Sequence, residues 1–405
     1  MDRSKNKEHD FSAKLRQASV IDQLKAYIEW RRNRGKTSET TPMPEFGPLS
    51  INLDLTTACN FACPHCVDSG IINTGEYLDI DIVKSSLDTL QSQGLLSVIL
   101  LGGGEPTLHK DFEEIVRYIK NKKLQLGVVT NGTRLRRVEK IADLLAEKDW
   151  LRISIDAARQ ETFFNSHKPK GGVTLRDILH KAQQVKLKNP KISLGYSFVI
   201  VWEGIEIGGH QLFPNINEIP QAVQLAREYA FDYISFKPCL LKLDVGQKES
   251  LFDPPDIERE RKVINDIQIN LAKAKEVAGG NIKILESINL KALIERKVHE
   301  LKKQPEMCHM QCFRTVLSPA GIFHCPAFRG NATAKLADQK GYLEGQPLQD
   351  TFRNLSQSVE HFNAQKECAV IACFYHHVNW WLEDFINSNK SVNDLEEIAD
   401  NDFFL

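Results

Sequence analysis

Eight of the nine cysteines in this chain fall into two groups, and grouped thiols can hold a metal ion or an iron–sulfur cluster. The first group is Cys59, Cys63 and Cys66, three thiols within eight residues. The second group consists of Cys308, Cys312, Cys325, Cys368 and Cys373. The first thirty residues alternate charges and lack the apolar core of a signal peptide, which predicts a cytoplasmic, reducing location. There, thiols serve as metal ligands more often than as disulfides.

The first group suits a cluster with an open position. Iron–sulfur clusters are usually held by four cysteine thiolates, so three thiolates leave one iron of a [4Fe–4S] cluster without a protein ligand. An open coordination position is also what separates a catalytic zinc site from a structural one. A zinc knuckle is the alternative, and it needs a fourth ligand. The local candidate, His65, is too close in sequence to Cys63 and Cys66 to converge with them easily.

Three further motifs follow predicted strands. The first is Gly102-Gly103-Gly104-Glu105, in which glycines let the backbone approach a ligand and the carboxylate can pair with an ammonium group. The second is a turn that contains Asn131. In the third, Ser154 and Asp156 alternate along a strand and therefore share one face.

A repeated order of elements positions these motifs. Short β-rich runs at 50–55, 97–101, 124–129, 151–155, 191–201 and 232–236 alternate with amphipathic patterns at 79–93, 111–120, 135–147, 174–188 and 217–229. Such alternation predicts an α/β fold with a parallel sheet, either a partial barrel or a doubly wound sheet. Both place their chemistry at the carboxyl ends of the strands, where the motifs lie.

The first cysteine group and the glycine turn resemble the signature of the radical S-adenosylmethionine (SAM) superfamily. The resemblance implies a partial (β/α)6 barrel over 48–240 and a [4Fe–4S] cluster on Cys59, Cys63 and Cys66. It also implies that Gly102, Gly103, Gly104 and Glu105 hold the methionine amine of SAM. By the same resemblance, Asn131, Ser154 and Asp156 contact the rest of the cofactor. His65 stands where the family usually has a carbocyclic aromatic residue near the adenine, and imidazole can also stack.

The second cysteine group resembles the auxiliary-cluster extensions called SPASM or twitch domains, here expected over 304–405. Two auxiliary clusters would need about seven ligands, so five thiols predict one auxiliary [4Fe–4S] cluster, of the twitch type. Which four cysteines bind is open, with Cys312 and Cys325 favoured. A zinc site made of the same thiols, or of nearby histidines, is the alternative. The remaining domains are expected to be an N-terminal helix and linker over 1–47 and a helical connector over 241–303.

Cys239 stands alone after the last predicted strand. Free cysteine is usually buried, so packing is its default role. At the carboxyl end of a strand it could also donate a hydrogen atom to a substrate radical, as a thiol does in some radical SAM epimerases.

The resemblance implies an enzyme that reductively cleaves SAM and abstracts a hydrogen atom through the 5′-deoxyadenosyl radical. We expect a small-molecule substrate undergoing dehydrogenation or epimerisation, with electrons supplied by a flavodoxin- or ferredoxin-like protein. The alternatives are a radical SAM maturase of a peptide or protein and a non-catalytic zinc protein. The 52 basic and 53 acidic residues give a net charge of −1, which favours neither a nucleic-acid nor a membrane partner. No apolar run approaches the ~18 residues of a membrane span.

Overall fold

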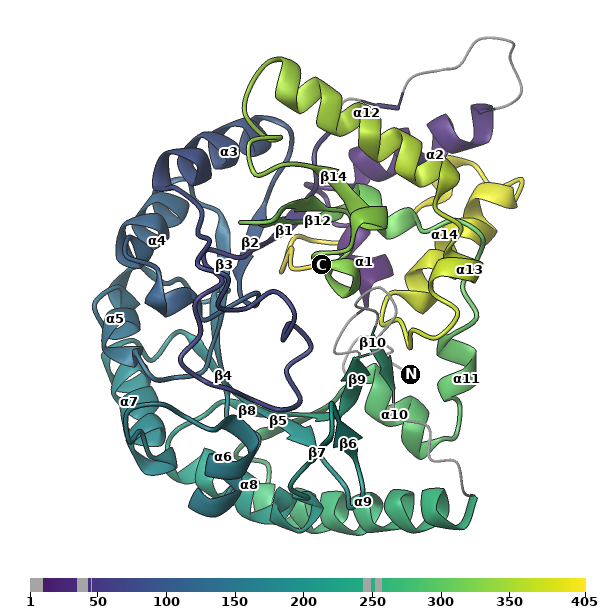
Figure 1. Cartoon of the computed structure of the whole chain (residues 1–405). Coiled ribbons are helices and arrows are strands. Elements are labelled where there is room, and N and C mark those ends of the chain that lie inside the picture. The colour runs from purple at the N-terminus through teal and green to yellow at the C-terminus, as the bar shows by residue number, and fades with distance from the viewer. Residues whose placement is uncertain (1–9, 35–42, 45, 243–248, 252–256) are drawn as a thin grey trace.

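A single ten-stranded sheet organises the molecule, in the order β11-β8-β5-β4-β3-β2-β1-β12-β13-β14. The computed structural model describes residues 10–34, 43–44, 46–242, 249–251 and 257–405. The six central strands pair in parallel, and each matches a predicted one. They are β1 (Ser50–Leu53), β2 (Ser97–Leu100), β3 (Gln125–Thr130), β4 (Trp150–Ser154), β5 (Ser193–Ile200) and β8 (Tyr233–Pro238). The sheet curves into an open barrel with helices outside it (Figure 1), which confirms the predicted fold class.

The outer helices are α3 (Ile80–Ser92), α4 (Phe112–Asn121), α5 (Leu135–Glu139), α7 (Leu175–Lys188) and α8 (Ile219–Glu228). Their starts are set by the sequence: the Asp79 side chain caps α3, and Thr174 and Asp177 form a capping box on α7. The predicted helix at 135–147 ends early and continues as a short 3-10 turn at Ala142–Leu144. A further helix, α6 (Gln160–His167), lies where no helix was predicted.

The sheet continues into the C-terminal third of the chain. The strand β12 (Arg314–Ser318) pairs in parallel with β1, and β13 (Gly321–Phe323) and β14 (Lys335–Ala337) follow it in antiparallel order. At the other edge, β11 (Lys283–Glu286) pairs with β8 inside the segment predicted to be a helical connector. Strands from three of the predicted domains, 48–240, 241–303 and 304–405, thus share one sheet. The domain boundaries drawn from the sequence stay a prediction.

The remaining elements surround this sheet. The connector holds the hairpin β9 (Leu240–Lys242) and β10 (Glu249–Leu251), and the helices α9 (Ile257–Ala278), α10 (Ile288–Ile294) and α11 (Val298–Leu301). A second hairpin, β6 (Glu206–Ile207) and β7 (His210–Gln211), follows β5. The N-terminal helices α1 (Phe11–Leu15) and α2 (Ile21–Asn33) pack against the C-terminal helix α14 (His376–Asn387). The helices α12 (Gln346–His361) and α13 (Ala364–Glu367) belong to the same C-terminal region (Figure 1). No helix in the described ranges is long and apolar enough to span a membrane.

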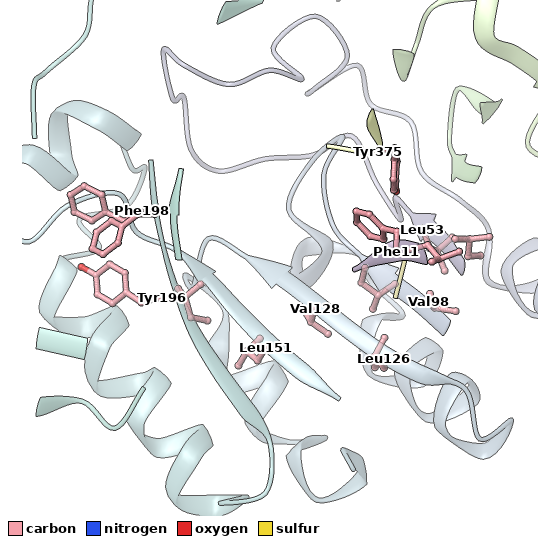
Figure 2. Packing of buried hydrophobic residues seen from close by; sticks show 14 of the residues in the cluster. Phe11, Leu53, Val98, Leu126, Val128, Leu151, Tyr196, Phe198 and Tyr375 are labelled. Atoms are coloured by element: carbon pink, nitrogen blue, oxygen red, sulfur yellow. The ribbon is translucent and has the colours of Figure 1, made fainter. Parts of the chain in front are cut away.

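The hydrophobic core binds the strands to their outer layer. Val98, Leu126, Val128 and Leu151 follow one another across neighbouring strands and are almost completely buried (Figure 2). The other face of the sheet lines the inside of the barrel, and near the amino ends of the strands it contacts the last residues of the chain. There the Gln125 side-chain amide donates to the Asn401 carbonyl, and the ring centroids of Phe404 and Trp150 lie 5.4 Å apart. The motif-bearing carboxyl ends of the strands lie at the other edge.

Candidate functional site

The loop after β1 brings the first three cysteines together. Burial raises the pKa of the Cys63 thiol well above its usual value, and the nearby Cys66 and Cys59 thiols raise it further. The Cys59 amide donates to the Asn73 side chain at 2.8 Å, which holds the start of the loop against its end. The structure thus gathers the predicted cluster ligands at the carboxyl edge of the sheet.

The glycine turn after β2 packs directly on this loop. A Cβ atom on Gly104 would lie 2.2 Å from the Thr56 carbonyl oxygen and 2.7 Å from that of Ala58. The next residue, Glu105, donates its backbone amide to the same Ala58 carbonyl at 2.8 Å. The third glycine is therefore needed for the close approach of two backbones, a reason that the sequence alone did not supply.

Glu105 joins this turn to the turn after β3. One carboxylate oxygen accepts from the Thr107 amide at 3.1 Å, from the Thr107 hydroxyl and from the Thr130 hydroxyl at 2.6 Å; the other accepts from the Asn131 amide at 2.7 Å. Burial raises the pKa of Glu105, and these donors oppose the change. The carboxylate also lies close enough to Cys59 to raise the pKa of that thiol, which is already raised by burial.

Asn131 is tied to the cysteine loop as well. Its side-chain amide donates to the Asn60 oxygen at 2.9 Å, and Asn60 in turn donates to the Thr133 hydroxyl at 3.0 Å. Sequence reasoning did not single out Asn60, although its place directly after Cys59 is a usable signal. The structure places Glu105 and Asn131 beside the first cysteine group.

Asp156 lies at the mouth of the barrel between two histidines. Its Oδ2 atom is 3.4 Å from His65 Nε2 and 3.6 Å from His167 Nε2, and its Oδ1 accepts from the Val199 amide at 2.7 Å. Burial favours the neutral acid, but the hydrogen bond from His65 and the two imidazoles outweigh it and lower the pKa of Asp156. The residue has a left-handed backbone, with φ of 53°, and so is fixed by its surroundings.

His167 was missed by the sequence analysis. Its Nδ1 atom lies 3.1 Å from Cys63 Sγ, and its Nε2 atom lies 2.7 Å from the Ile155 carbonyl oxygen. Burial lowers its pKa to about 4, so the ring is neutral near pH 7. It ends the unpredicted helix α6, and nothing local in the sequence links that helix to the cysteine loop. Ser154, the other predicted cofactor contact, pairs in register with Ser197 of β5.

The second cysteine group is divided by its packing. Cys308, Cys325, Cys368 and Cys373 contact one small hydrophobic cluster that includes Val316, Phe323 and Phe328. Burial raises the pKa of Cys373, and the neighbouring Cys308 and Cys325 thiols raise it further. Cys312 is fully buried in the main core and hydrogen-bonded to Tyr27, and the nearby Cys308 thiol adds to the rise in its pKa that burial causes. The packing therefore favours a ligand set made of Cys308, Cys325, Cys368 and Cys373. The sequence had favoured Cys312 and Cys325 as members of the set.

The sulfur spacing differs from that of a zinc site. All nine cysteines lie in the described ranges. Within those ranges, one group of three or more histidine, cysteine or carboxylate side chains has its ligand atoms within 4.8 Å of one another, and it consists of His65, Asp156 and His167. Sulfurs around a tetrahedral zinc with bonds of about 2.3 Å lie about 3.8 Å apart. A [4Fe–4S] cluster needs wider spacing, because each sulfur binds a different iron. In the described residues, neither cysteine group therefore has three sulfurs as close together as a tetrahedral zinc site needs.

Cys239 is completely buried in the main core at the carboxyl end of β8, and its amide donates to the Ile200 carbonyl at 3.0 Å. Burial, together with the Asp156 carboxylate, raises the pKa of its thiol to about 12. This environment suits the packing role, and the hydrogen-donor role stays a prediction.

Comparison with known proteins agrees with this geometry. Residues 53–200 match the model of the Radical SAM superfamily. An S-adenosylmethionine-dependent nucleotide dehydratase of Selenomonas ruminantium is 31% identical over 157 residues, which cover 37% of this chain and 56% of the relative. The mycofactocin maturase MftC of Mycolicibacterium smegmatis is 34% identical over 116 residues, which cover 28% of this chain and 29% of the relative. The chain thus spans about half, or less, of the length of these curated relatives.

Two solved structures share the fold over most of the chain. Streptococcus suis SuiB bound to S-adenosylmethionine has a TM-score of 0.53 at 15% identity, and the match covers 78% of this chain and 66% of SuiB. The structure of anSMEcpe with bound AdoMet has a TM-score of 0.54 at 14% identity, and covers 86% of this chain and 99% of that one. The shared fold extends beyond the residues matched by the family model.

Proposed function

Because residues 53–200 belong to the radical SAM superfamily, whose members bind a [4Fe–4S] cluster and SAM, we propose that this chain is a radical SAM enzyme acting on a small anionic molecule. Such a cluster, with SAM bound, would supply the electron for reductive cleavage of the sulfonium, and with it the chemistry for abstracting a hydrogen atom from a substrate. The observation that carries the proposal is the convergence of Cys59, Cys63 and Cys66 with the glycine turn and Glu105.

The residues around the loop would bind and orient the cofactor. Glu105 Oε1 already accepts from three donors, whereas Oε2 accepts from one, so Oε2 keeps a lone pair for the amine of SAM. Asn131 would hold the loop in place through Asn60. Asp156 accepts from His65, which fixes the imidazole ring for stacking on adenine. Ser154 ends β4, two residues before Asp156, and would contact the ribose or carboxylate.

An arginine inside the barrel supports the anionic substrate. Leu151 and Ile153 of β4 are fully buried, so Arg152 projects from the opposite, inner face with Trp150. Its guanidinium carbon lies 5.3 Å from the Trp150 ring centroid, and its Nε atom is buried without a hydrogen-bond partner. A buried donor without a partner is costly, and a phosphate or carboxylate would satisfy it.

The names of two relatives agree with this choice. The nucleotide dehydratase and a GTP 3′,8-cyclase of Klebsiella pneumoniae, 34% identical over 119 residues, are both named for nucleotide chemistry. The peptide maturase stays the second candidate, since a mycofactocin maturase is also a relative and SuiB has been solved with its precursor peptide SuiA.

The second cysteine group would hold an auxiliary [4Fe–4S] cluster through Cys308, Cys325, Cys368 and Cys373. These thiols share one small hydrophobic cluster, and low exposure to water is one of the features that set the potential of a cluster. A flavodoxin- or ferredoxin-like protein is the proposed electron donor.

The test is anaerobic reconstitution followed by analysis of iron, sulfide and zinc and an assay for 5′-deoxyadenosine with dithionite and SAM. We expect about eight irons per chain and measurable 5′-deoxyadenosine, which should be lost in Cys59→Ala, Cys63→Ala and Cys66→Ala. Stimulation by nucleotides but not by synthetic peptides, with KM raised at least tenfold in Arg152→Met, supports the small-molecule substrate. Stimulation by peptides alone favours the maturase. Zinc without sulfide would refute radical chemistry.

A further inference from the structure

Arg329 connects the two cysteine groups. It follows Cys325 by one turn of 3-10 helix, η5 (Pro326–Phe328), and its side chain is 6% exposed. The guanidinium reaches across to the first cysteine loop, where its Nη1 atom lies 2.9 Å from Asp68 Oδ1 and 3.1 Å from Asp68 Oδ2. Its Nε atom lies 2.6 Å from Oδ2 of Asp54, which follows β1 and is completely buried. One arginine from the C-terminal segment thus pairs with two carboxylates that flank Cys59–Cys66.

These carboxylates lie directly against the glycine turn. Asp68 Oδ2 accepts from the Gly103 amide at 3.1 Å. A Cβ atom on Gly102 would lie 2.8 Å from Asp68 Oδ2 and 3.2 Å from Arg329 Nη1, and one on Gly103 would lie 3.0 Å from Asp54 Oδ2. The first two glycines of the turn therefore make room for this ion cluster.

The electrostatic balance of the cluster depends on Arg329. Burial raises the pKa of Asp54 well above its usual value; the Arg329 guanidinium lowers it, and the nearby Asp68 carboxylate raises it. Breaking a buried ion pair by removing one partner leaves an uncompensated buried charge, which is strongly destabilising. Without the guanidinium, the two carboxylates would separate or draw in water, and the Gly103 amide would lose its fixed acceptor.

We propose that Arg329 is a positioning residue that couples the C-terminal cysteine group to the SAM-binding turn. The role in SAM binding rests on the function proposed above, whereas the contact itself does not. A cluster bound at Cys325 would restrain η5 and hold Arg329 on Asp68. Coupling of this kind is reciprocal, so SAM binding would also favour the ordered C-terminal site.

Hydrogen exchange of the metal-free chain tests the contact without activity. Arg329→Gln should raise the exchange rate of the Gly103 amide at least tenfold, and Arg329→Lys, which keeps the charge, should raise it less. Arg353→Gln, which removes an ion pair with Asp350 whose two side chains are about half exposed, is the matched control and should leave the rate unchanged. If Arg329→Gln does not fold, Gly102→Ala decides, because its Cβ would press on both Asp68 Oδ2 and Arg329 Nη1 while keeping every charge. An unchanged Gly103 rate in the folded variant overturns the proposal.

Equilibrium dialysis tests the coupling in the reconstituted protein. Arg329→Gln should raise the Kd for SAM at least tenfold while the iron held by Cys59, Cys63 and Cys66 is retained. Cys325→Ser should also raise the Kd for SAM. A SAM affinity equal to that of the wild type in both variants overturns the coupling. A wild-type chain that neither binds SAM nor forms 5′-deoxyadenosine would refute the proposed function, while the exchange result would still decide the contact.

Discussion

Replacing Glu105 by glutamine should destabilise the chain even before any cofactor binds. Glutamine can keep the oxygen that faces Thr107 and Thr130, but its NH2 group would then face the Asn131 amide, which now donates to Glu105 at 2.7 Å. A hydrogen bond to a charged group contributes about 1.5–3 kcal/mol, so the loss of this bond should cost about 2.5 kcal/mol. Relief from burying a charge offsets part of this cost, whereas the new contact between two donors adds to it.

The loss converts into a measurable shift of the melting temperature. Unfolding entropy is about 2.1 cal/mol/K per residue, or about 0.85 kcal/mol/K for 405 residues, so 2.5 kcal/mol should lower Tm by about 3 °C. Differential scanning calorimetry of the metal-free chain measures it. Glu114→Gln is the control, since Glu114 forms an exposed ion pair with Lys84 that is worth at most about 1 kcal/mol.

The result separates two roles for Glu105. A lowered Tm together with weakened SAM binding agrees with a carboxylate that both joins two turns and binds the amine. A Tm for Glu105→Gln that equals that of the wild type would show that the hydrogen bond from the Asn131 amide contributes nothing to folding, and would refute the reasoning.

Three further predictions concern neighbouring positions. Gly104→Ala should destabilise the metal-free chain by about 3 kcal/mol in denaturant unfolding, because its Cβ would meet the Thr56 backbone. Gly75→Ala is the control: it lies in open space at a φ of 88° and should cost about 1 kcal/mol. Equal losses of stability in the two variants would contradict this prediction. Burial lowers the pKa of His109, whose Nε2 bonds the Leu78 carbonyl at 2.9 Å, so the unfolded chain takes up a proton at a higher pH than the folded one. The stabilising contribution of neutral His109 is present above about pH 6.5 and is lost as the pH falls through the lowered pKa of the folded state. His109→Gln should therefore flatten the fall of Tm between pH 7 and pH 5. An unchanged slope of Tm against pH would contradict this assignment. Cys239 keeps its proton at pH 7 because its pKa is raised to about 12, as a hydrogen-atom donor requires. If the enzyme is an epimerase, solvent deuterium should enter the product and disappear with Cys239→Ala; deuterium that persists in the variant would exclude this thiol.

Much of the fold could be predicted because its signals are local. The six central strands and most of the outer helices follow from alternating short apolar runs and amphipathic patterns, with caps such as Thr174. The strand β11 lies in a segment that the sequence predicted to be a helical connector, because a four-residue strand gains its identity by pairing with β8. The place of β12 beside β1 has the same cause, since two segments about 260 residues apart pair through the path of the whole chain.

The sequence by itself determined the chemistry that this protein can hold: three thiols in one short loop, a glycine turn with an acid, and polar residues at the ends of the third and fourth strands. Tertiary structure decided which groups meet. His167 reaches Cys63 from an unpredicted helix, Cys312 is completely buried in the main core, and Arg329 pairs with Asp68 across 261 positions. Residue type and spacing act within a few residues, whereas burial and ion pairing depend on which distant segments the sheet brings to the same edge.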